Sequence, residues 1–258
     1  MVSDERIHWA ASGGFQAGVE RYERGRPSYP PEAVEFVVDA LGIGPGRTLV
    51  DLGAGTGKFT RLIADRGAEL IAVEPVEAMR SKLAELVPTA RVLDGTAENI
   101  PLGDGSADAV VVAQAYHWFD GERALPEIHR VLRAGGRLAM IWNVRDEAVE
   151  WVERLTVILD RLAVDVPRHR TGEWRRAFGE AELFGPLHRW VTFHVHRVDR
   201  ERLLDRVASI SYVAAAPVAD RERILAEVRK LLDTAPELGG RDEIAMPYRT
   251  EVYWTARR

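Results

Sequence analysis

The sequence predicts an α/β fold: a doubly wound, mostly parallel sheet of seven strands with an antiparallel edge pair and a helical cap. Three observations lead to this prediction. Over residues 1–145, short apolar runs alternate with segments of helical period, which is the pattern of right-handed βαβ units. These runs are continuously apolar, as is typical of parallel strands buried on both faces. Two later segments alternate apolar with polar residues, as half-exposed strands do.

The elements of the first part follow in a regular order. Strands are expected at 47–52, 68–74, 90–95, 107–115 and 137–143. Helices are expected between them at 56–66, 75–87 and 122–136. Pro75 suits the first turn of its helix, where no N–H is needed, and the pair Gly135–Gly136 is a common helix stop. In such a sheet ligands bind beyond the carboxyl ends of the strands, so the site is expected there.

The second part, residues 146–258, is expected to supply a helical cap that binds substrate and two strands that complete the sheet. The alternating strands are predicted at 187–198 and 248–258. Amphipathic helices are predicted at 199–213 and 219–235. The last helix carries one apolar stripe, formed by Ile224, Val228, Leu231 and Leu232.

Composition excludes several classes of function. The chain has 258 residues, a formal net charge of −5 and no basic block, so no nucleic-acid partner is expected. It has no cysteine, which excludes disulfides, thiolate catalysis and cysteine-bound zinc. No apolar run approaches the roughly 18 residues that span a bilayer, and the first residues do not resemble a signal peptide. A cytoplasmic location without a membrane partner is the expectation.

The segment "LVDLGAGTGKF" (49–59) restricts the kind of cofactor. Its glycines stand at alternate positions, Gly53, Gly55 and Gly57. The dinucleotide fingerprint G-x-G-x-x-G needs a glycine where Lys58 stands, and the spacing of a P-loop does not fit either. Phosphate is therefore not the group expected here. The alternative is a glycine turn that serves only a tight connection between strand and helix.

At "VDLGAGTG" the sequence resembles the first motif of class I S-adenosylmethionine (SAM)-dependent methyltransferases. The resemblance implies a Rossmann-like fold, SAM as cofactor, S-adenosylhomocysteine as product, and no metal. It also implies that residues 1–145 form a SAM-binding core whose N-terminal segment covers the cofactor. Glycines let the backbone approach a ligand closely, and a carboxylate at Glu74 would accept hydrogen bonds from both ribose hydroxyls.

Three further segments match in the right order. "LDGTAENIPL" resembles the family's adenine-framing segment, although Thr96 stands where many relatives have Asp. "AQAYHWF" (113–119) narrows the resemblance to a small-molecule subgroup of type 11 methyltransferases that includes trans-aconitate-type enzymes. "YERGRPSYPPEAV" (22–34) resembles that subgroup's segment near the cofactor carboxylate. The candidate cofactor-binding residues are Tyr22, Arg26, Asp51, Gly53, Ala54, Gly55, Gly57, Glu74, Pro75, Met79, Thr96, Ala97, Glu98, Gln114 and Ala115.

The predicted reaction is transfer of a methyl group to a small-molecule acceptor, at the oxygen of a carboxylate or hydroxyl. In-line displacement at a sulfonium methyl depends mainly on positioning and on exclusion of water. A hydroxyl acceptor would also need a general base, whereas a carboxylate would not. His117 is the candidate base, with a purely structural role as its alternative. Candidate acceptor-binding residues are Trp118, Trp142, Asn143, Arg145 and Tyr212.

Histidines on the strand 187–198 raise the possibility of a metal site. His194 and His196 share one face, and the opposite face carries Phe193 and Val195. The apolar face is expected to be buried, which leaves the histidines toward solvent or the cap, so no metal is expected.

Two other functions stay open at this point. A catalytically silent SAM-binding protein would carry the same cofactor motifs. A nicotinamide-dependent reductase could use the same kind of sheet, although the glycine spacing argues against it. The identity of the acceptor and the oligomeric state are left undetermined by the sequence.

Overall fold

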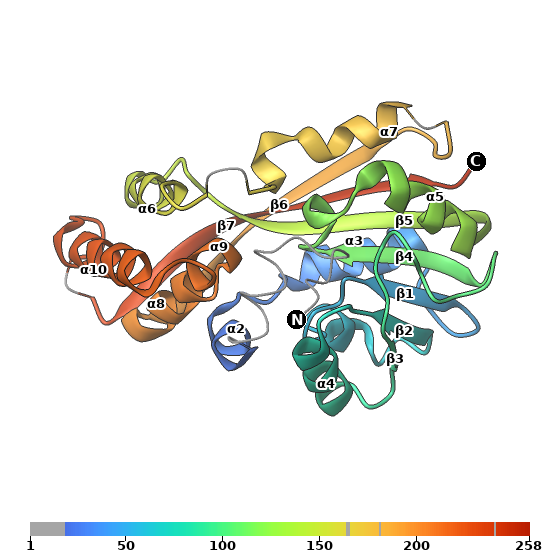
Figure 1. The fold of residues 1–258 in the computed structure, drawn as a ribbon, viewed down its shortest axis with the longest axis horizontal. Helices are drawn as coiled ribbons and strands as arrows, with labels where there is room; N and C mark the ends of the chain where they lie inside the picture. Colours follow the sequence, from blue (N-terminus) through green and yellow to red (C-terminus); the bar gives the residue numbers. More distant parts are fainter. Residues whose placement is uncertain (1–18, 164–165, 181, 240) are drawn as a thin grey trace.

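The structure is a computed structural model that describes residues 19–163, 166–180, 182–239 and 241–258. Residues 1–18, where no signal peptide is predicted, lie outside the described part. A single seven-stranded sheet runs in the order β3-β2-β1-β4-β5-β7-β6 (Figure 1). The strands are β1 Thr48–Leu52, β2 Glu69–Val73, β3 Arg91–Leu93, β4 Ala107–Ala113, β5 Leu132–Arg145, β6 His188–Asp199 and β7 Glu243–Ala256.

The pairing of the strands confirms the predicted Rossmann-like sheet. Strands β1 to β5 are parallel to one another, while β7 runs antiparallel to both β5 and β6 at the edge. Helices surround the sheet (Figure 1). They are α2 Val19–Gly25, α3 Pro31–Leu41, α4 Glu77–Leu86, α5 Gly121–Val131, α6 Glu150–Asp160, α7 Arg176–Glu180, α8 Arg200–Ala208, α9 Ser211–Ala214 and α10 Val218–Thr234.

The parallel strands are buried on both faces because neighbouring residues enter different cores. Leu49 of β1 packs in the cluster under α3, whereas Val50 packs in the cluster under α5 and α7. Val110 and Val111 of β4 divide between the two clusters in the same way. This alternation explains why these strands read as continuous apolar runs in the sequence.

A further core lies beyond the carboxyl ends of the parallel strands. Helices α6, α8, α9 and α10 pack there with the outer parts of β6 and β7 (Figure 1). The predicted stripe of the last helix faces this core, since Ile224, Val228, Leu231 and Leu232 are all buried. The helices therefore gather at the end of the sheet where ligands bind in this kind of fold.

Three predicted helices differ in the structure. The helix expected at 56–66 is a run of turns with one short 3₁₀ segment, Thr60–Ile63. The reason is the glycine loop, because Gly57 has φ of 79° and the Thr60 hydroxyl bonds back to Asp51. The helix expected at 199–213 is interrupted, since Ile210 is extended between α8 and α9.

The Gly135–Gly136 pair does not end the helix predicted at 122–136. Helix α5 ends at Val131, and the chain enters β5 at once. The pairing of β4 with β5 then skips from Leu132 to Arg137, and Gly135, with φ of 73°, accommodates the irregularity between them. The last strand also begins earlier than predicted, at Glu243.

The prediction that the apolar face of β6 is buried is wrong. Phe193 is 64% exposed and Val195 is 52% exposed, whereas His194 and His196 are half-buried. The inward face of this edge strand meets polar and aromatic partners: His194 stacks on Tyr248 at 5.5 Å and its Nδ1 lies 3.2 Å from the Thr250 hydroxyl. Contacts with β7 therefore determine which face of β6 points inward.

Candidate active site

A cavity lies at the carboxyl ends of β1 to β4. Most of the predicted cofactor-binding residues line it: Tyr22, Gly53, Gly55, Glu74, Pro75, Met79, Thr96, Ala97, Glu98, Gln114 and Ala115. Trp118, predicted to bind the acceptor, also lines it. The sequence analysis did not single out Val76, Gly95 and Ala113, which complete the wall together with Phe119 of the "HWF" segment.

The glycine loop forms one side of this cavity, and its backbone requires glycine. Gly53 has φ of 69°, and a Cβ there would lie 2.8 Å from the Cβ of Ala115. Gly55 has φ of 58°, and a Cβ there would point toward the Tyr22 hydroxyl, 3.9 Å away. The missing side chain of Gly55 thus leaves open the space between the loop and α2.

Glu74 fixes this loop from the end of β2. Its carboxylate is buried; Oε2 accepts the N–H of Gly55 at 2.8 Å and Oε1 accepts the N–H of Val76 at 2.9 Å. Burial raises the pKa of this carboxyl group, and the two backbone N–H groups act in the opposite direction. Each oxygen has a second lone pair, so the carboxylate can also accept hydrogen bonds from a ligand.

Four predicted cofactor residues lie outside this cavity: Arg26, Asp51, Ala54 and Gly57. Asp51 is buried behind the loop, where Oδ2 accepts the Thr60 hydroxyl at 2.6 Å and burial raises its pKa to about 7. Gly57 is adjacent to Leu83 of α4. Asp51 and Gly57 therefore shape the loop from behind, whereas Arg26 and Ala54 line a smaller neighbouring cavity.

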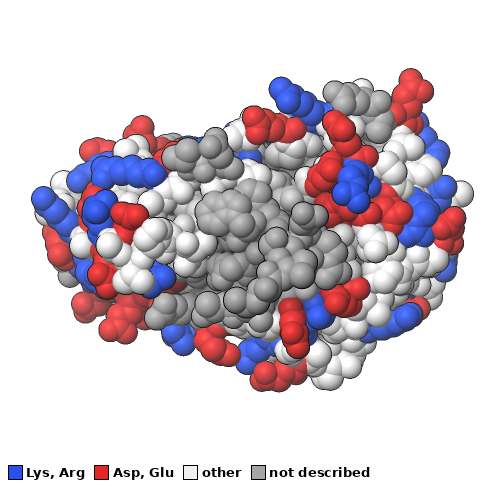
Figure 2. Space-filling model, in the orientation of Figure 1, with Lys and Arg blue, Asp and Glu red and all other residues white. Residues whose placement is uncertain are grey.

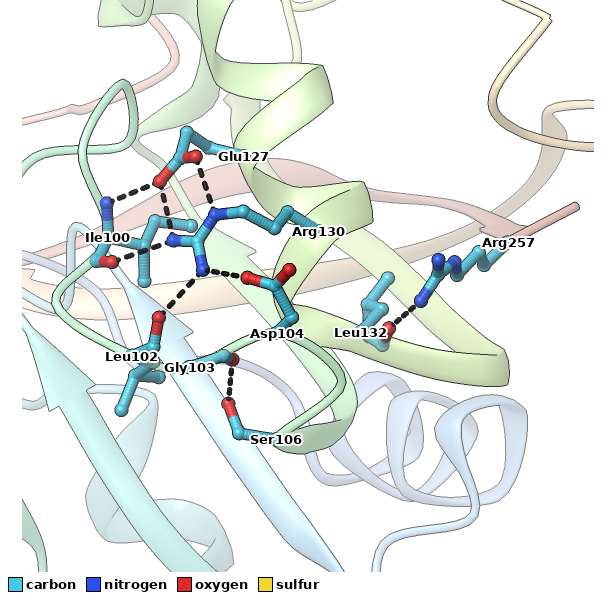
Figure 3. A network of polar contacts seen from close by, with 9 residues as sticks. All are labelled: Ile100, Leu102, Gly103, Asp104, Ser106, Glu127, Arg130, Leu132 and Arg257. Atoms are coloured by element: carbon cyan, nitrogen blue, oxygen red, sulfur yellow. Dashed lines mark hydrogen bonds and ion pairs between the residues drawn. The ribbon is translucent and has the colours of Figure 1, made fainter.

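The segment after β3, which carries Thr96 to Glu98, is held by a polar network on α5 (Figure 3). Glu127 Oε2 accepts the N–H of Ile100 at 3.0 Å. Arg130 donates to the carbonyls of Ile100 at 3.0 Å and Leu102 at 2.8 Å, and it pairs with Glu127 (Figure 3). The network fixes the backbone just beyond the cavity wall.

A second cavity adjoins the first, and both are lined by Tyr22, Gln114 and Trp118. Gln114 is the one non-glycine residue with positive φ, 63°, in the described part of the chain. Such a conformation is found most often at functional sites. The predicted residues that line the second cavity are Arg26, His117, Trp118, Trp142, Asn143, Arg145 and Tyr212. A ligand in one cavity can therefore contact a ligand in the other.

His117 lies on the wall of the second cavity in a defined tautomer. The indole Nε1–H of Trp142 donates to His117 Nδ1 at 3.2 Å. Because an indole N–H can only donate, Nδ1 must be the unprotonated nitrogen, and the neutral ring carries its proton on Nε2. Burial, together with His169 and Arg26, lowers the pKa of His117 to about 3.

Comparisons with known proteins agree with this arrangement. The family described as "Methyltransferase domain" matches residues 50–140. An uncharacterized methyltransferase of Mycobacterium tuberculosis is 43% identical over 236 residues, which cover 92% of each chain. This chain belongs to the class I SAM-dependent methyltransferases. An uncharacterized methyltransferase-like protein of Schizosaccharomyces pombe is 36% identical over 93% of each chain.

Solved structures show the same fold for this methyltransferase. The crystal structure of the YcgJ protein from Bacillus subtilis matches with a TM-score of 0.60 and 19% identity, over 88% of this chain and 98% of that chain. The first cavity fits the cofactor of the family, because the glycine loop leaves open space opposite Tyr22 and Glu74 offers buried carboxylate oxygens.

Behind His117 the methyltransferase has a buried polar cluster that the sequence analysis did not find. The His169 ring packs on Trp142 with 4.4 Å between ring centroids. The Glu251 carboxylate accepts hydrogen bonds from Arg189 at 3.0 Å, from Arg249 at 2.7 Å and from the Tyr253 hydroxyl at 2.6 Å. Arg249, Glu251 and Tyr253 alternate along β7, but His169 and Arg189 come from distant segments, so the sequence does not indicate that these groups meet.

The other acceptor candidates have partners of their own. Asn143 Oδ1 accepts the Thr250 hydroxyl at 2.6 Å. Arg145 Nε donates to the Thr156 hydroxyl at 3.3 Å, and no ion pair joins Arg145 to Asp146 or Glu147. Tyr212 is buried in the cap core.

Two further observations concern the described residues only. They contain no group of three or more His, Asp or Glu side chains that could hold a metal ion. None of their helices is both long enough and apolar enough to cross a membrane.

Lys and Arg are interspersed with Asp and Glu over the charged parts of the face drawn in Figure 2.

Proposed function

We propose that this methyltransferase transfers the methyl group of SAM to an oxygen of a small-molecule acceptor bound in the second cavity. One observation supports the proposal above all: the two cavities meet at Tyr22, Gln114 and Trp118. An acceptor there would lie directly beside the cofactor. The proposal includes the small-molecule subgroup with the "HWF" segment, since His117 and Trp118 line the acceptor cavity.

The cofactor would be held by residues of the first cavity. Glu74 would accept the ribose hydroxyls, the backbone of Gly53 to Gly55 would contact the sugar and the methionine part, and Thr96 to Glu98 would border the adenine. Bound SAM supplies a methyl group that its sulfonium charge already activates. The protein therefore needs to position the acceptor and exclude water, without covalent catalysis.

In this proposal His117 orients the acceptor as a hydrogen-bond donor. Trp142 already occupies Nδ1, so the group that remains is Nε2–H. A nitrogen that already carries a proton cannot remove one from a hydroxyl. It can donate to an oxygen that is already anionic, and such an oxygen needs no general base. The tautomer thus favours a carboxylate over a hydroxyl as the acceptor group.

The experiment is transfer of labelled methyl from SAM to a panel of small carboxylic acids, phenols and amines. Esters formed from the acids are the expected product. Calorimetry with SAM on the same protein separates the alternatives: tight SAM binding without transfer to any acid, phenol or amine supports a silent binding protein. Transfer to phenols or amines, with none to acids, contradicts the carboxylate assignment.

A further inference from the structure

Two arginines from distant parts of the chain lie together at the junction of the cavities. Arg26 directly follows α2, and Arg206 belongs to α8. Both line the second cavity and also the smaller cavity beside the glycine loop, with Ala54 and Lys58. The helices pack closely here, because a Cβ on Gly25 would lie 2.6 Å from the backbone nitrogen of Arg206.

Neither guanidinium has a carboxylate partner among the described residues. Within that part of the chain the Arg206 guanidinium makes no ion pair, and its Nε and Nη1 are buried without a hydrogen-bond partner. Arg26 Nη2 donates to the carbonyl of Ser209 at 3.2 Å, and its Nε is buried without a partner. The Arg26 guanidinium also lies 4.9 Å from the centroid of the Tyr22 ring.

Several neighbouring cations on α8 and near α2 do have carboxylate partners, in contrast to Arg26 and Arg206. On α8, Arg200 pairs with Asp233 and Arg202 pairs with Asp199. Near α2, Lys58 and Arg61 both pair with Glu23. Burial and the Arg206 charge lower the pKa of Arg26 to about 10. Two half-buried like charges without an anion are unfavourable, so this arrangement is suited to binding one.

We propose that Arg26 and Arg206 together bind a carboxylate at this junction. A carboxylate is planar and accepts paired N–H groups, which matches the buried Nε edges of two guanidinium groups. The inference rests on the proposed function, which brings two sources of carboxylate to this place: the methionine end of SAM and an acidic acceptor. The resemblance already places Arg26 near the cofactor carboxylate; Arg206, from the cap, is the new member.

The site has a structural consequence for the cap. Arg26 belongs to the segment that adjoins the cofactor cavity, and Arg206 belongs to the cap that walls the acceptor cavity. A carboxylate bound by both would neutralise their repulsion and hold α8 against the end of α2. Binding of the anion would therefore tighten the wall of the acceptor cavity.

The test uses Arg206→Gln and Arg206→Lys in the full chain, with Arg202→Gln as control, since Arg202 is exposed on the same helix and paired with Asp199. Calorimetry measures binding of SAM, of decarboxylated SAM, and of succinate in the presence of S-adenosylhomocysteine. The control variant should bind all three as the wild type does. A melting temperature close to that of the wild type shows that each variant is folded.

If the site binds the carboxylate of the cofactor, Arg206→Gln lowers the affinity for SAM at least tenfold and changes the affinity for decarboxylated SAM little. If it takes the acceptor's carboxylate, SAM is unaffected and succinate binding is lost. Unchanged binding of both SAM and succinate by a folded Arg206 variant overturns the proposal. Failure of the wild type to bind SAM would instead overturn the proposed function, so the two failures are distinguishable.

Discussion

Replacing His117 separates the role of a hydrogen-bond donor from that of a general base. The ring accepts one hydrogen bond, from Trp142, and offers one N–H to the acceptor cavity. His117→Gln keeps both functions, because an amide oxygen can accept from the indole while the amide nitrogen donates. His117→Ala removes both and leaves the buried indole N–H of Trp142 without a partner.

The expected size of the effect follows from these contacts. A hydrogen bond to a charged group contributes about 1.5–3 kcal/mol, which corresponds to about 10- to 150-fold in kcat/KM for His117→Ala. The unpaired indole N–H adds about 1–3 kcal/mol of lost stability. His117→Gln should retain kcat/KM within about tenfold of the wild type, because neither hydrogen bond is removed outright.

The assay is kcat/KM for methyl transfer to the acid that accepts the label, measured from pH 5 to 8. The pKa of His117 is lowered to about 3, so the ring is neutral throughout and contributes no slope of its own; the wild-type and His117→Gln profiles should have the same shape. A base with an ordinary histidine pKa would instead lose activity about tenfold per pH unit below about 6.5. Such a slope in the wild type, absent from His117→Gln, would refute the donor role. Nitrogen NMR of the imidazole gives an independent check, with the proton expected on Nε2.

Three further substitutions test the scaffold around the site. Gly53→Ala places a Cβ 2.8 Å from Ala115 at a φ of 69°; a loss of about 2–3 kcal/mol of stability and weaker SAM binding are expected by urea unfolding and calorimetry. Arg130→Met removes the donor to the carbonyls of Ile100 and Leu102, in the loop that we propose borders the adenine. The affinity for SAM, measured by calorimetry, should fall about fivefold, and the affinity for decarboxylated SAM should fall by the same factor. Glu251→Gln should destabilise by about 3 kcal/mol at pH 7, because the native pKa of about 2 lies below the unfolded value of about 4.3. This contribution to the free energy of unfolding is complete above the unfolded pKa and is lost as pH falls toward 2. The free energies of unfolding of wild type and variant should therefore converge in acid. A difference between them that stays constant with pH would contradict the prediction.

The order of strands and helices could be predicted because it is written in local patterns. Continuous apolar runs, the glycine spacing after β1 and the acid at Glu74 each depend on neighbours within a few residues. The same is true of the first cavity, where the predicted cofactor-binding residues follow the ends of successive strands. Parallel topology then brings those ends to one edge of the sheet, so the cavity is assembled without further information.

The errors have two causes: contacts with a distant strand, and a local backbone conformation that overrides the helical pattern. Alternation along β6 shows that the strand has two faces, but the inward one is selected by Tyr248 and Thr250 on β7. The helix predicted at 56–66 fails because glycines in a left-handed conformation hold the chain in turns. Hydrophobicity alone would bury Phe193, which the structure exposes.

The chemistry of the site depends on the same kind of distant contact. From its motif alone, His117 is a reasonable general base, since its ordinary pKa suits proton transfer near neutral pH. The indole of Trp142, on the neighbouring strand β5, blocks one ring nitrogen and so fixes the proton on the other. Arg26 and Arg206 likewise come together only because α2 packs on α8. Motifs therefore predict where the cofactor binds, whereas the partners of these three side chains are the basis of our proposal that the second cavity recognises an oxygen that is already negatively charged.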